Sequence, residues 1–374
     1  MLKECERMEH IRSFQIHDYK GIHNLELKEL NSINILTGDN NSGKTSVLEL
    51  LSTLDFPEKI STWGQCVRIS GSRLRNRDYF NAFYNIFPVD KEKNEISYTF
   101  HTSEDLINTV KLEAVIEDAQ VTEREMHRIN GFIKTGSQKQ EDELIDTFCM
   151  NLYTYINDGM VDKNKIYAFQ TILPRLGAGY KKQNFHFYNT VYISPVDHAS
   201  GELYLNEVLS DTEFYEEMLN ILKIFDKNII SINALKSENN PFFPEYMILK
   251  KNQQKALPVG AYGDGMKKAM LLLSAVVKAK GGILLLDEFE TAIHTSAMDS
   301  IFAWVLKSAL KLNVQVFLTS HSKEAIDKVL KCSEELQPYI NLYTLYNVDG
   351  KNYVRSMNCQ EAIDAKDNLG LELR

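Results

Sequence analysis

The residues most clearly suited to chemistry form one glycine-rich loop. It reads Gly38-Asp39-Asn40-Asn41-Ser42-Gly43-Lys44-Thr45 and fits the spacing Gly-x-x-x-x-Gly-Lys-Ser/Thr without a mismatch. Such glycines let successive backbone N–H groups point at a phosphate, and the following helix adds the positive end of its dipole. In this pattern Lys44 reaches the β- and γ-phosphate oxygens and assists catalysis, while Thr45 ligates Mg²⁺. We expect ATP to be held by Gly38, Asn40, Asn41, Ser42, Gly43, Lys44, Thr45 and Ser46.

Two apolar runs end in residues that suit hydrolysis. The run Ile283–Leu286 leads directly into Asp287 and Glu288. Open α/β sheets bind ligands at the carboxyl ends of their strands, so we expect Asp287 to hold Mg²⁺ through water and Glu288 to orient the attacking water. The run Val314–Leu318 leads to His321, which could donate to the γ-phosphate. Glu288 and His321 are therefore candidate catalytic residues.

A second glycine pair precedes an apolar helix. Gly263, Asp264, Gly265 and Lys267 come just before the run Ala269–Val277. Backbone N–H groups at the beginning of a helix attract anions, so this loop is a second candidate phosphate contact.

These residues need a particular set of elements to position them. A buried strand at 33–36 precedes the phosphate loop, and a helix at 44–54 with one apolar face follows it. Alternating or apolar runs predict further strands at 11–16, 24–28, 96–100, 110–115, 190–193, 283–286 and 314–318, helices at 301–310 and 324–330, and a closing hairpin at 342–346 and 353–357 joined through Asp349-Gly350. The pattern predicts an α/β fold with an antiparallel β lobe near the N-terminus and a mainly parallel core sheet flanked by helices.

One part of the chain does not follow this pattern. From about 117 to 185, charged stretches such as Glu123–Arg128 and Glu141–Met150 alternate with glycine breaks. We interpret it as a mostly helical insertion. The predicted domains are 1–116, with the β lobe and phosphate loop, the insertion at 117–188, and 189–374, with the remaining site residues and the hairpin.

Composition narrows the class of protein. The chain has 374 residues, 44% of them hydrophobic, and a formal charge of −9 from 42 basic and 51 acidic residues. Such a balance excludes disordered, collagen-like and generally basic nucleic-acid-coating proteins. The five cysteines form no Cys-x-x-Cys pair, and no apolar run could span a bilayer, so we expect a cytoplasmic protein without zinc or membrane contact.

Taken together, the motifs resemble those of ABC-type ATPases in the SMC, RecF and OLD (overcoming lysogenization defect) group, most closely small AAA-family proteins related to OLD. The matching blocks are Ser13–Gly21 with Lys20, Gly38–Thr45, Gly263–Lys268, Asp287–His294 and Thr319–Ser322. The resemblance implies an ABC-type P-loop fold and a homodimer or higher homo-oligomer. In it, ATP lies between the phosphate loop of one chain and the signature loop of the other.

The resemblance also assigns residues. It adds Lys20 and the signature residues Gly263, Asp264, Gly265 and Lys267 to the ATP site. The family's signature serine falls on Gly263, so backbone N–H groups and Lys267 would have to replace its hydroxyl. The D-loop falls on 290–294. The Q-loop glutamine has two candidates, Gln65 and the polar turn after Ile193.

Three functions stay open at this point. The preferred one is a defence-system sensor that controls a separately encoded effector, a nuclease possibly of the TOPRIM type. The sequence has no Asp-x-Asp pair for a TOPRIM metal site, so nuclease activity in this chain is not expected. The alternatives are a RecF-like ATPase that clamps DNA, with contacts through Arg73, Arg75 and Arg77 and through the lysines at 181–182, and a non-hydrolysing ATP-bound scaffold.

Overall fold

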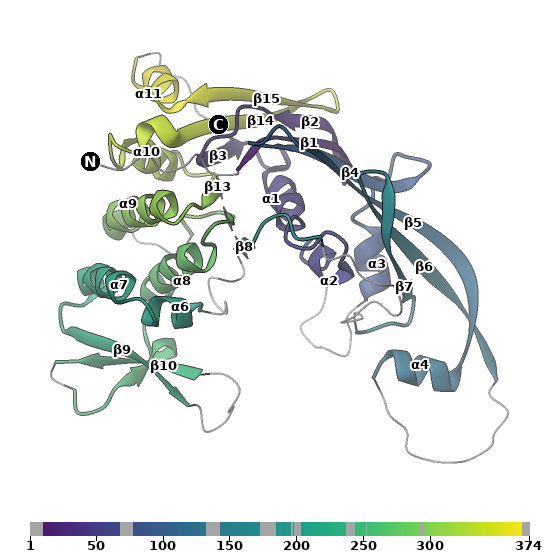
Figure 1. Ribbon diagram of the computed structural model, residues 1–374, viewed down its shortest axis with the longest axis horizontal. Coiled ribbons are helices and arrows are strands. Elements are labelled where there is room, and N and C mark those ends of the chain that lie inside the picture. Colours follow the sequence, from purple (N-terminus) through teal and green to yellow (C-terminus); the bar gives the residue numbers. More distant parts are fainter. Residues whose placement is uncertain are drawn as a thin grey trace. The chain divides into compact units, whose positions relative to one another are not determined.

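The structure is a computed structural model that describes residues 10–67, 78–131, 143–172, 185–195, 197, 203–236, 244–251, 253–291 and 295–368 (Figure 1). The chain divides into two compact units. Unit 1 consists of Met1–Glu29, Thr45–Phe187 and Tyr346–Val354, and unit 2 of Leu30–Lys44, Tyr188–Leu345 and Arg355–Arg374. The phosphate loop up to Lys44 therefore belongs to unit 2, and Thr45 and Ser46 open a segment of unit 1.

Unit 1 is built on an antiparallel sheet of six strands in the order β2-β1-β4-β5-β6-β7. The strands are β1 (Ile11–Tyr19), β2 (Ile22–Leu27), β4 (Asn94–Thr102), β5 (Ile107–Thr122), β6 (Leu144–Ile156) and β7 (Gly159–Tyr167). Buried side chains alternate with less buried ones over parts of the inner strands, for example Phe14 and Ile16 of β1 and Tyr98 and Phe100 of β4. This alternation confirms the predicted antiparallel β lobe.

Four helices accompany this sheet: α1 (Lys44–Ser52), α2 (Ile60–Trp63), α3 (Tyr79–Tyr84) and α4 (Glu123–Ile129). Helix α1 buries Val47, Leu48 and Leu51 completely, which explains the one apolar face seen in its sequence. Helix α4 begins with a capping box between Thr122 and Glu125.

The prediction of a mostly helical insertion at 117–188 is wrong for the described residues. Only α4 is helical there; β5 continues to Thr122, and β6 and β7 form a hairpin whose turn holds Asn157 and Asp158 at positive φ. Residues 115–118 of β5 are exposed on both faces, and charged residues stand among the apolar ones, so the alternation from which strands are recognised is interrupted there. Charged residues were then mistaken for a solvated helix. The three domain boundaries themselves stay a prediction.

Unit 2 contains the second six-stranded sheet, in the order β15-β14-β3-β13-β12-β8, except for the hairpin end Tyr346–Val354, which is counted with unit 1. Its strands are β3 (Ile33–Gly38), β8 (Thr190–Ile193), β12 (Ile283–Leu286), β13 (Gln315–Thr319), β14 (Ile340–Val348) and β15 (Lys351–Asn358). The five strands from β14 to β8 pair in parallel. Strands β3, β12 and β13 are buried at every position, as expected of a parallel sheet covered on both faces.

The predicted closing hairpin is also present. Strands β14 and β15 are neighbours, and both turn residues, Asp349 and Gly350, have positive φ. A two-residue turn of this kind matches the twist of a hairpin.

The helices of unit 2 are α6 (Leu205–Leu209), α7 (Thr212–Phe225), α8 (Asp264–Lys278), α9 (Thr295–Lys311), α10 (Lys323–Lys331) and α11 (Cys359–Asp367), with short 3₁₀ turns η2 (Val259–Ala261) and η3 (Gln337–Tyr339). A small antiparallel sheet of β9 (Ile229–Lys236), β10 (Pro244–Lys250) and β11 (Leu257–Pro258) was not predicted. The main hydrophobic cluster joins α8 and α9 to the parallel sheet. Among the described residues, no helix has both the length and the apolar character needed to cross a membrane.

Candidate functional site

The phosphate loop has a backbone that only small residues can follow. Gly38, Asn41 and Gly43 all have positive φ, at 137°, 66° and 100°. A Cβ atom on Gly38 would lie 2.1 Å from the carbonyl oxygen of Leu345 on the paired strand β14. Glycine is therefore required at position 38 both by backbone conformation and by space. Left-handed residues within such a loop form an N–H-lined hollow that suits an anion.

The Lys44 side chain curls back onto this loop. It is 5% exposed, and its Nζ donates to the carbonyl oxygens of Gly38 at 2.9 Å and Asp39 at 2.8 Å. A third contact joins it to the Ser42 hydroxyl oxygen at 3.3 Å. Burial lowers the pKa of Lys44, and the negative charges of Asp287, Asp39 and Glu288 oppose this only in part. A buried ammonium of this kind would gain from an anionic ligand.

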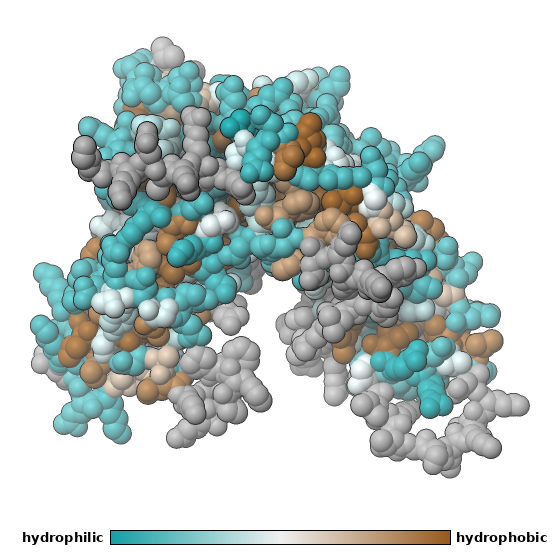
Figure 2. Space-filling view, viewed as in Figure 1, coloured by the Kyte–Doolittle hydropathy of each residue, from teal (hydrophilic) through white to brown (hydrophobic). Residues whose placement is uncertain are grey.

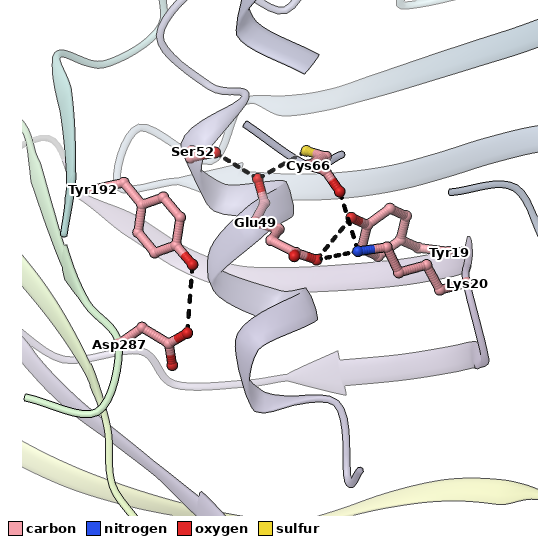
Figure 3. A network of polar contacts seen from close by, with 7 residues as sticks. All are labelled: Tyr19, Lys20, Glu49, Ser52, Cys66, Tyr192 and Asp287. Atoms are coloured by element: carbon pink, nitrogen blue, oxygen red, sulfur yellow. Dashed lines mark hydrogen bonds and ion pairs between the residues drawn. The ribbon is translucent and has the colours of Figure 1, made fainter. Parts of the chain in front are cut away.

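Asp287 lies where the predicted strand ends, and a neighbouring strand supports it. The parallel register places Leu286 beside Leu318, so the next residues, Asp287 and Thr319, meet at the same sheet edge. The Thr319 hydroxyl donates to Asp287 Oδ1 at 2.5 Å and accepts from the Glu288 N–H at 2.8 Å. The Tyr192 hydroxyl, from β8, donates to Asp287 Oδ2 at 3.4 Å (Figure 3). Three strands thus fix one carboxylate that is 2% exposed.

Glu288 occupies an unusual backbone conformation. Its φ of 47° lies in the left-handed region, which residues with a side chain rarely adopt. Two backbone bonds hold it there: Phe289 N–H donates to the Thr319 carbonyl at 3.2 Å, and Thr291 N–H to the Glu288 carbonyl at 2.9 Å. Phe289, 1% exposed, anchors the turn in the core. Strain of this sort marks sites where a side chain must be aimed.

Ser320 and His321, which follow β13, are hydrogen-bonded to Glu290. The Ser320 hydroxyl donates to Glu290 Oε1 at 2.8 Å, and the His321 backbone N–H points at the same oxygen at 3.4 Å. The His321 side chain is exposed. The structure thus brings the D-loop glutamate to the expected histidine segment, within unit 2.

The second glycine loop is open. Gly263 is the N-cap of α8, with φ −65°, and nothing lies within 4 Å of a Cβ atom placed on it. Asp264 and Gly265 already belong to the first helical turn, and Lys267 Nζ lies 3.4 Å from Asp264 Oδ1. The helix has no side-chain N-cap hydrogen bond, so its first N–H groups suit an anion.

Sequence reasoning missed a buried lysine one turn further along. Lys268 is completely buried, and desolvation lowers its pKa to about 7, against the raising influence of Glu290, Asp197 and Asp287. The signal was present in the sequence, because Lys268 shares a helical face with Leu271, Leu272 and Ala275. Thr319 and Tyr192 were missed as well; only strand register reveals them.

Lys20 lies in a different setting, inside unit 1. Its Nζ pairs with Glu49 Oε2 at 2.6 Å and donates to the Cys66 carbonyl at 3.1 Å (Figure 3). The buried Tyr19 hydroxyl donates to the same Glu49 oxygen at 2.9 Å, and burial raises the pKa of Tyr19 and takes that of Cys66 to about 12. The contacts of the Lys20 ammonium thus involve Glu49 of α1 and Cys66, both residues of unit 1.

The remaining predicted residues fall into those that the structure describes and those that it does not. Of the two Q-loop candidates, Gln65 is an exposed residue of unit 1, whereas the turn after β8 is closed by Ser194, whose N–H and hydroxyl both donate to Asp197 Oδ2, at 2.8 and 2.7 Å. Arg73, Arg75 and Arg77, the lysines at 181–182 and the D-loop residues 292–294 lie outside the described residues.

A metal ion was predicted on Thr45 and Asp287. Within the described ranges, no group of three or more His, Cys, Asp or Glu side chains could hold one. A hydroxyl and a carboxylate are nonetheless the hard oxygen donors that Mg²⁺ takes alongside nucleotide phosphates. The donor chemistry therefore fits a magnesium ion bound together with a nucleotide, and not a metal held by protein alone.

Comparison with known proteins gives one family and several relatives. Residues 33–327 match the family described as "AAA domain, putative AbiEii toxin, Type IV TA system". A Helicobacter pylori protein named ATP/GTP phosphatase is 25% identical over 340 residues, which cover 85% of this chain and 86% of that one. An uncharacterized Methanocaldococcus jannaschii protein is 34% identical over 113 residues, 30% of this chain and 98% of the other.

Solved structures give a weaker likeness. An Smc head domain with an extended coiled coil, bound to the C-terminal domain of ScpA derived from Pyrococcus furiosus, aligns with 97% of this chain and 100% of that chain at 11% identity and a TM-score of 0.48. At this score the likeness carries no functional argument. The family match spans both glycine loops and both strand ends, and it confirms the ABC-type AAA ATPase and the α/β P-loop fold predicted from the motifs.

Proposed function

We propose, from the premise that the chain belongs to this AAA domain family, that it is an ATP-driven switch. It binds ATP with Mg²⁺, pairs with a second copy around the nucleotide, hydrolyses it, and thereby controls a separately encoded effector protein in a defence system. The observation that carries the nucleotide chemistry is the union, within unit 2, of a buried loop lysine with a strand-end carboxylate. The printed name of the Helicobacter pylori relative supports phosphate-ester hydrolysis.

Each residue has a task that its geometry supports. The loop N–H groups and Lys44 bind the triphosphate, with Lys44 exchanging carbonyl partners for phosphate oxygens. Thr45 and Asp287 would hold the magnesium ion, which would supply positive charge to the leaving phosphates. Thr319 keeps Asp287 in place through its 2.5 Å hydrogen bond. Glu288, aimed by its left-handed backbone, accepts a proton from the attacking water or orients it.

The open signature loop supports the pairing of two copies. Gly263 and the uncapped N-terminus of α8 offer N–H groups with no side chain in the way. In the proposed dimer these groups, together with Gly265 and Lys267, face the nucleotide of the partner copy. His321, exposed just after β13, would contact the γ-phosphate. Because its backbone N–H points at Glu290 Oε1, this contact would link the γ-phosphate to Glu290.

The proposed control of a separate effector protein rests on two features of the sequence. The chain has an ATPase site and, in its sequence, no Asp-x-Asp pair for a TOPRIM nuclease. The family description names a putative toxin of a type IV toxin–antitoxin system, which supports a defence setting with a separate partner gene. A nuclease effector, with ATP state setting its release, fits this arrangement.

The first test uses Glu288→Gln and Lys44→Ala, with Glu216→Gln as an exposed control on α7. We expect Glu288→Gln to keep ATP binding and ATP-induced dimers while phosphate release falls about 100-fold or more. Lys44→Ala should lose both ATP binding and dimers. Fluorescent-nucleotide titration, light scattering and phosphate release measure these. Full turnover in Glu288→Gln would refute the assigned roles.

Two alternatives stay distinguishable. Gly263 lacks the hydroxyl expected of a signature loop, so a non-hydrolysing scaffold predicts that phosphate release is negligible in the unmodified chain and insensitive to Glu288→Gln. A DNA clamp predicts ATP-stimulated, salt-dependent DNA binding that weakens when Arg73, Arg75 and Arg77 are neutralised. Capture of the Glu288→Gln chain with ATP, with and without nuclease treatment, separates a protein partner from DNA.

A further inference from the structure

The far end of the β5–β6 hairpin is a two-stranded ribbon. Strand β4 pairs with β5 only as far as Ala114, and β7 pairs with β6 only from Cys149 onward. Beyond these points β5 and β6 pair with each other, apart from one bond of 3.0 Å from the Ala168 N–H to the Phe148 carbonyl, and they run on together toward α4 (Figure 1). We call Val115–Thr122 and Leu144–Phe148 the outer ribbon. Within the part of the chain that the structure describes, no strand lies along the outer edge of β5 there.

One face of the outer ribbon continues the core face of unit 1. Opposed residues of an antiparallel pair share a face, and Ala114 and Leu152, at most 7% exposed, form one such pair. On the same face, further out, Ile116, Phe148 and Leu144 are 38%, 54% and 60% exposed. Figure 2 shows hydrophobic side chains gathered over this part of β5 and β6. Apolar side chains therefore continue along this face beyond the part of the sheet that the core of unit 1 covers.

The outer ribbon is hollowed and negatively charged. A concavity of about 740 Å³ is lined by Asp118, Ala119, Gln120, Asp146, Thr147 and Phe148. The outer ribbon carries the carboxylates of Glu117, Asp118 and Asp146 and has no lysine or arginine in its sequence. Glu117 accepts from Asn151 at 2.8 Å, and Asp146 from Gln120 at 2.9 Å, both neutral amides. Glu117 and Asp146 thus have amide partners, and the outer ribbon itself contains no basic residue that could pair with its carboxylates.

We propose that the outer ribbon binds an extended, basic segment of a partner protein, which adds to β5 as a further strand. The unpaired edge supplies main-chain hydrogen bonds, as in other cases of strand addition. Apolar side chains of the segment lie over Ile116 and Phe148, and basic side chains face Asp118 and Asp146. A second copy of this chain is a poor occupant, because two ribbons of the same negative charge repel each other.

The test uses the full-length chain and a defined probe. The probe is a fluorescein-labelled peptide that repeats Val-Thr-Lys-Thr, so that valine and lysine alternate along one face of the strand. Its comparators carry glutamate for lysine, or N-methyl groups on alternate backbone nitrogens. Fluorescence anisotropy at low salt should show binding of the lysine peptide alone, at least tenfold weaker after N-methylation. Hydrogen exchange should slow in Val115–Thr122 and not along β9 of unit 2. Failure of the lysine peptide to bind, equal binding of the glutamate or N-methylated peptide, or equal protection of β9 would overturn the proposal.

Variants tie the binding to this face. We expect Phe148→Ser, and separately the pair Asp118→Asn with Asp146→Asn, to weaken the lysine peptide at least tenfold. Leu235→Ser, 51% exposed on β9, and Glu216→Gln are the matched controls and should bind as the unmodified chain does. Unchanged affinity in both ribbon variants would contradict the proposal. Each variant's ATP turnover reports on the nucleotide site, so the two proposals can fail separately.

Discussion

The two glycine loops of unit 2 look alike in sequence and differ in structure. At Gly38 the backbone has φ 137° and a Cβ atom would meet a main-chain oxygen at 2.1 Å, whereas Gly263 has φ −65° and open space around it. The first loop makes its contacts within its own chain, and the Lys44 side chain folds back onto it. The second offers uncapped N–H groups and has no contact that demands glycine.

The sharpest way to break this comparison is Gly38→Ala. We expect it to cost about 2 to 4 kcal/mol of folding free energy and to abolish ATP binding, because both the left-handed backbone and the Leu345 oxygen oppose a side chain. Chemical denaturation and nucleotide titration measure these effects. Gly21→Ala, where nothing lies within 4 Å, is the control. Wild-type ATP affinity in Gly38→Ala would show that the loop is not held as described.

Thr319→Val tests the hydroxyl that supports Asp287, the carboxylate that acts together with the phosphate loop in the proposed site. The change leaves Asp287 Oδ1 and the Glu288 N–H without their hydroxyl partner, so we expect a loss of about 1 to 3 kcal/mol in stability. Turnover should fall about tenfold or more while ATP affinity changes little. Thr344→Val is the matched control, since that buried hydroxyl has no hydrogen-bond partner. Equal effects of the two substitutions would remove Thr319 from the site.

Lys268→Met examines the helix behind the open loop. Between pH 7 and the ordinary lysine pKa of 10.5, the unfolded chain holds a proton that the folded chain has released. The lysine therefore makes stability rise with pH across this window, and the variant lacks that contribution. The unfolding free energy of wild type minus variant should grow by about 1 kcal/mol per pH unit from pH 7 to 10. A difference that stays constant with pH would contradict the low pKa; Lys280→Met, at an exposed position, is the control for the loss of a lysine.

Gly263→Ser is expected to do least to the fold. With open space and an ordinary φ, it should change stability by less than about 0.5 kcal/mol. The added hydroxyl should raise ATP turnover about two- to tenfold if it meets the partner's γ-phosphate. Gly260→Ser, also in open space, is the control for phosphate-release assays. A large stability loss would mean that the second loop is as constrained as the first.

Much of unit 2 could be predicted because its strands are uniformly apolar and its motifs sit at strand ends. The runs at 33–36, 283–286 and 314–318 became β3, β12 and β13 with small shifts of boundary. Thr319 could not be recognised, since its role depends on the register that sets it beside Asp287. Lys268 was not among the predicted site residues, although its place on an apolar helical face was the clue.

Unit 1 was predictable only where one face of its sheet is covered. The alternation in β1 and β4 reports a buried face, so these strands were recognised. The outer ribbon lacks that signal, because Ile116, Leu144 and Phe148 are exposed and charged residues stand between them. Periodicity records burial within a chain, and it does not distinguish a surface kept for another molecule from a solvated helix.

The order of strands in unit 2 also determines how late in synthesis its sheet can form. Strand β3, which leads into the phosphate loop, lies between β13 and β14, and its Asn34 side chain donates to the carbonyl of Val316, 282 residues further along the chain. An emerging chain therefore exposes a strand that is buried at every position in the folded protein, with neither neighbour present until most of the chain has been synthesised. Contacts this distant in sequence slow folding and leave sticky edges exposed to other chains. We expect truncation before Gln315 to yield a chaperone-bound or aggregated product with no nucleotide affinity, however intact its phosphate-loop sequence.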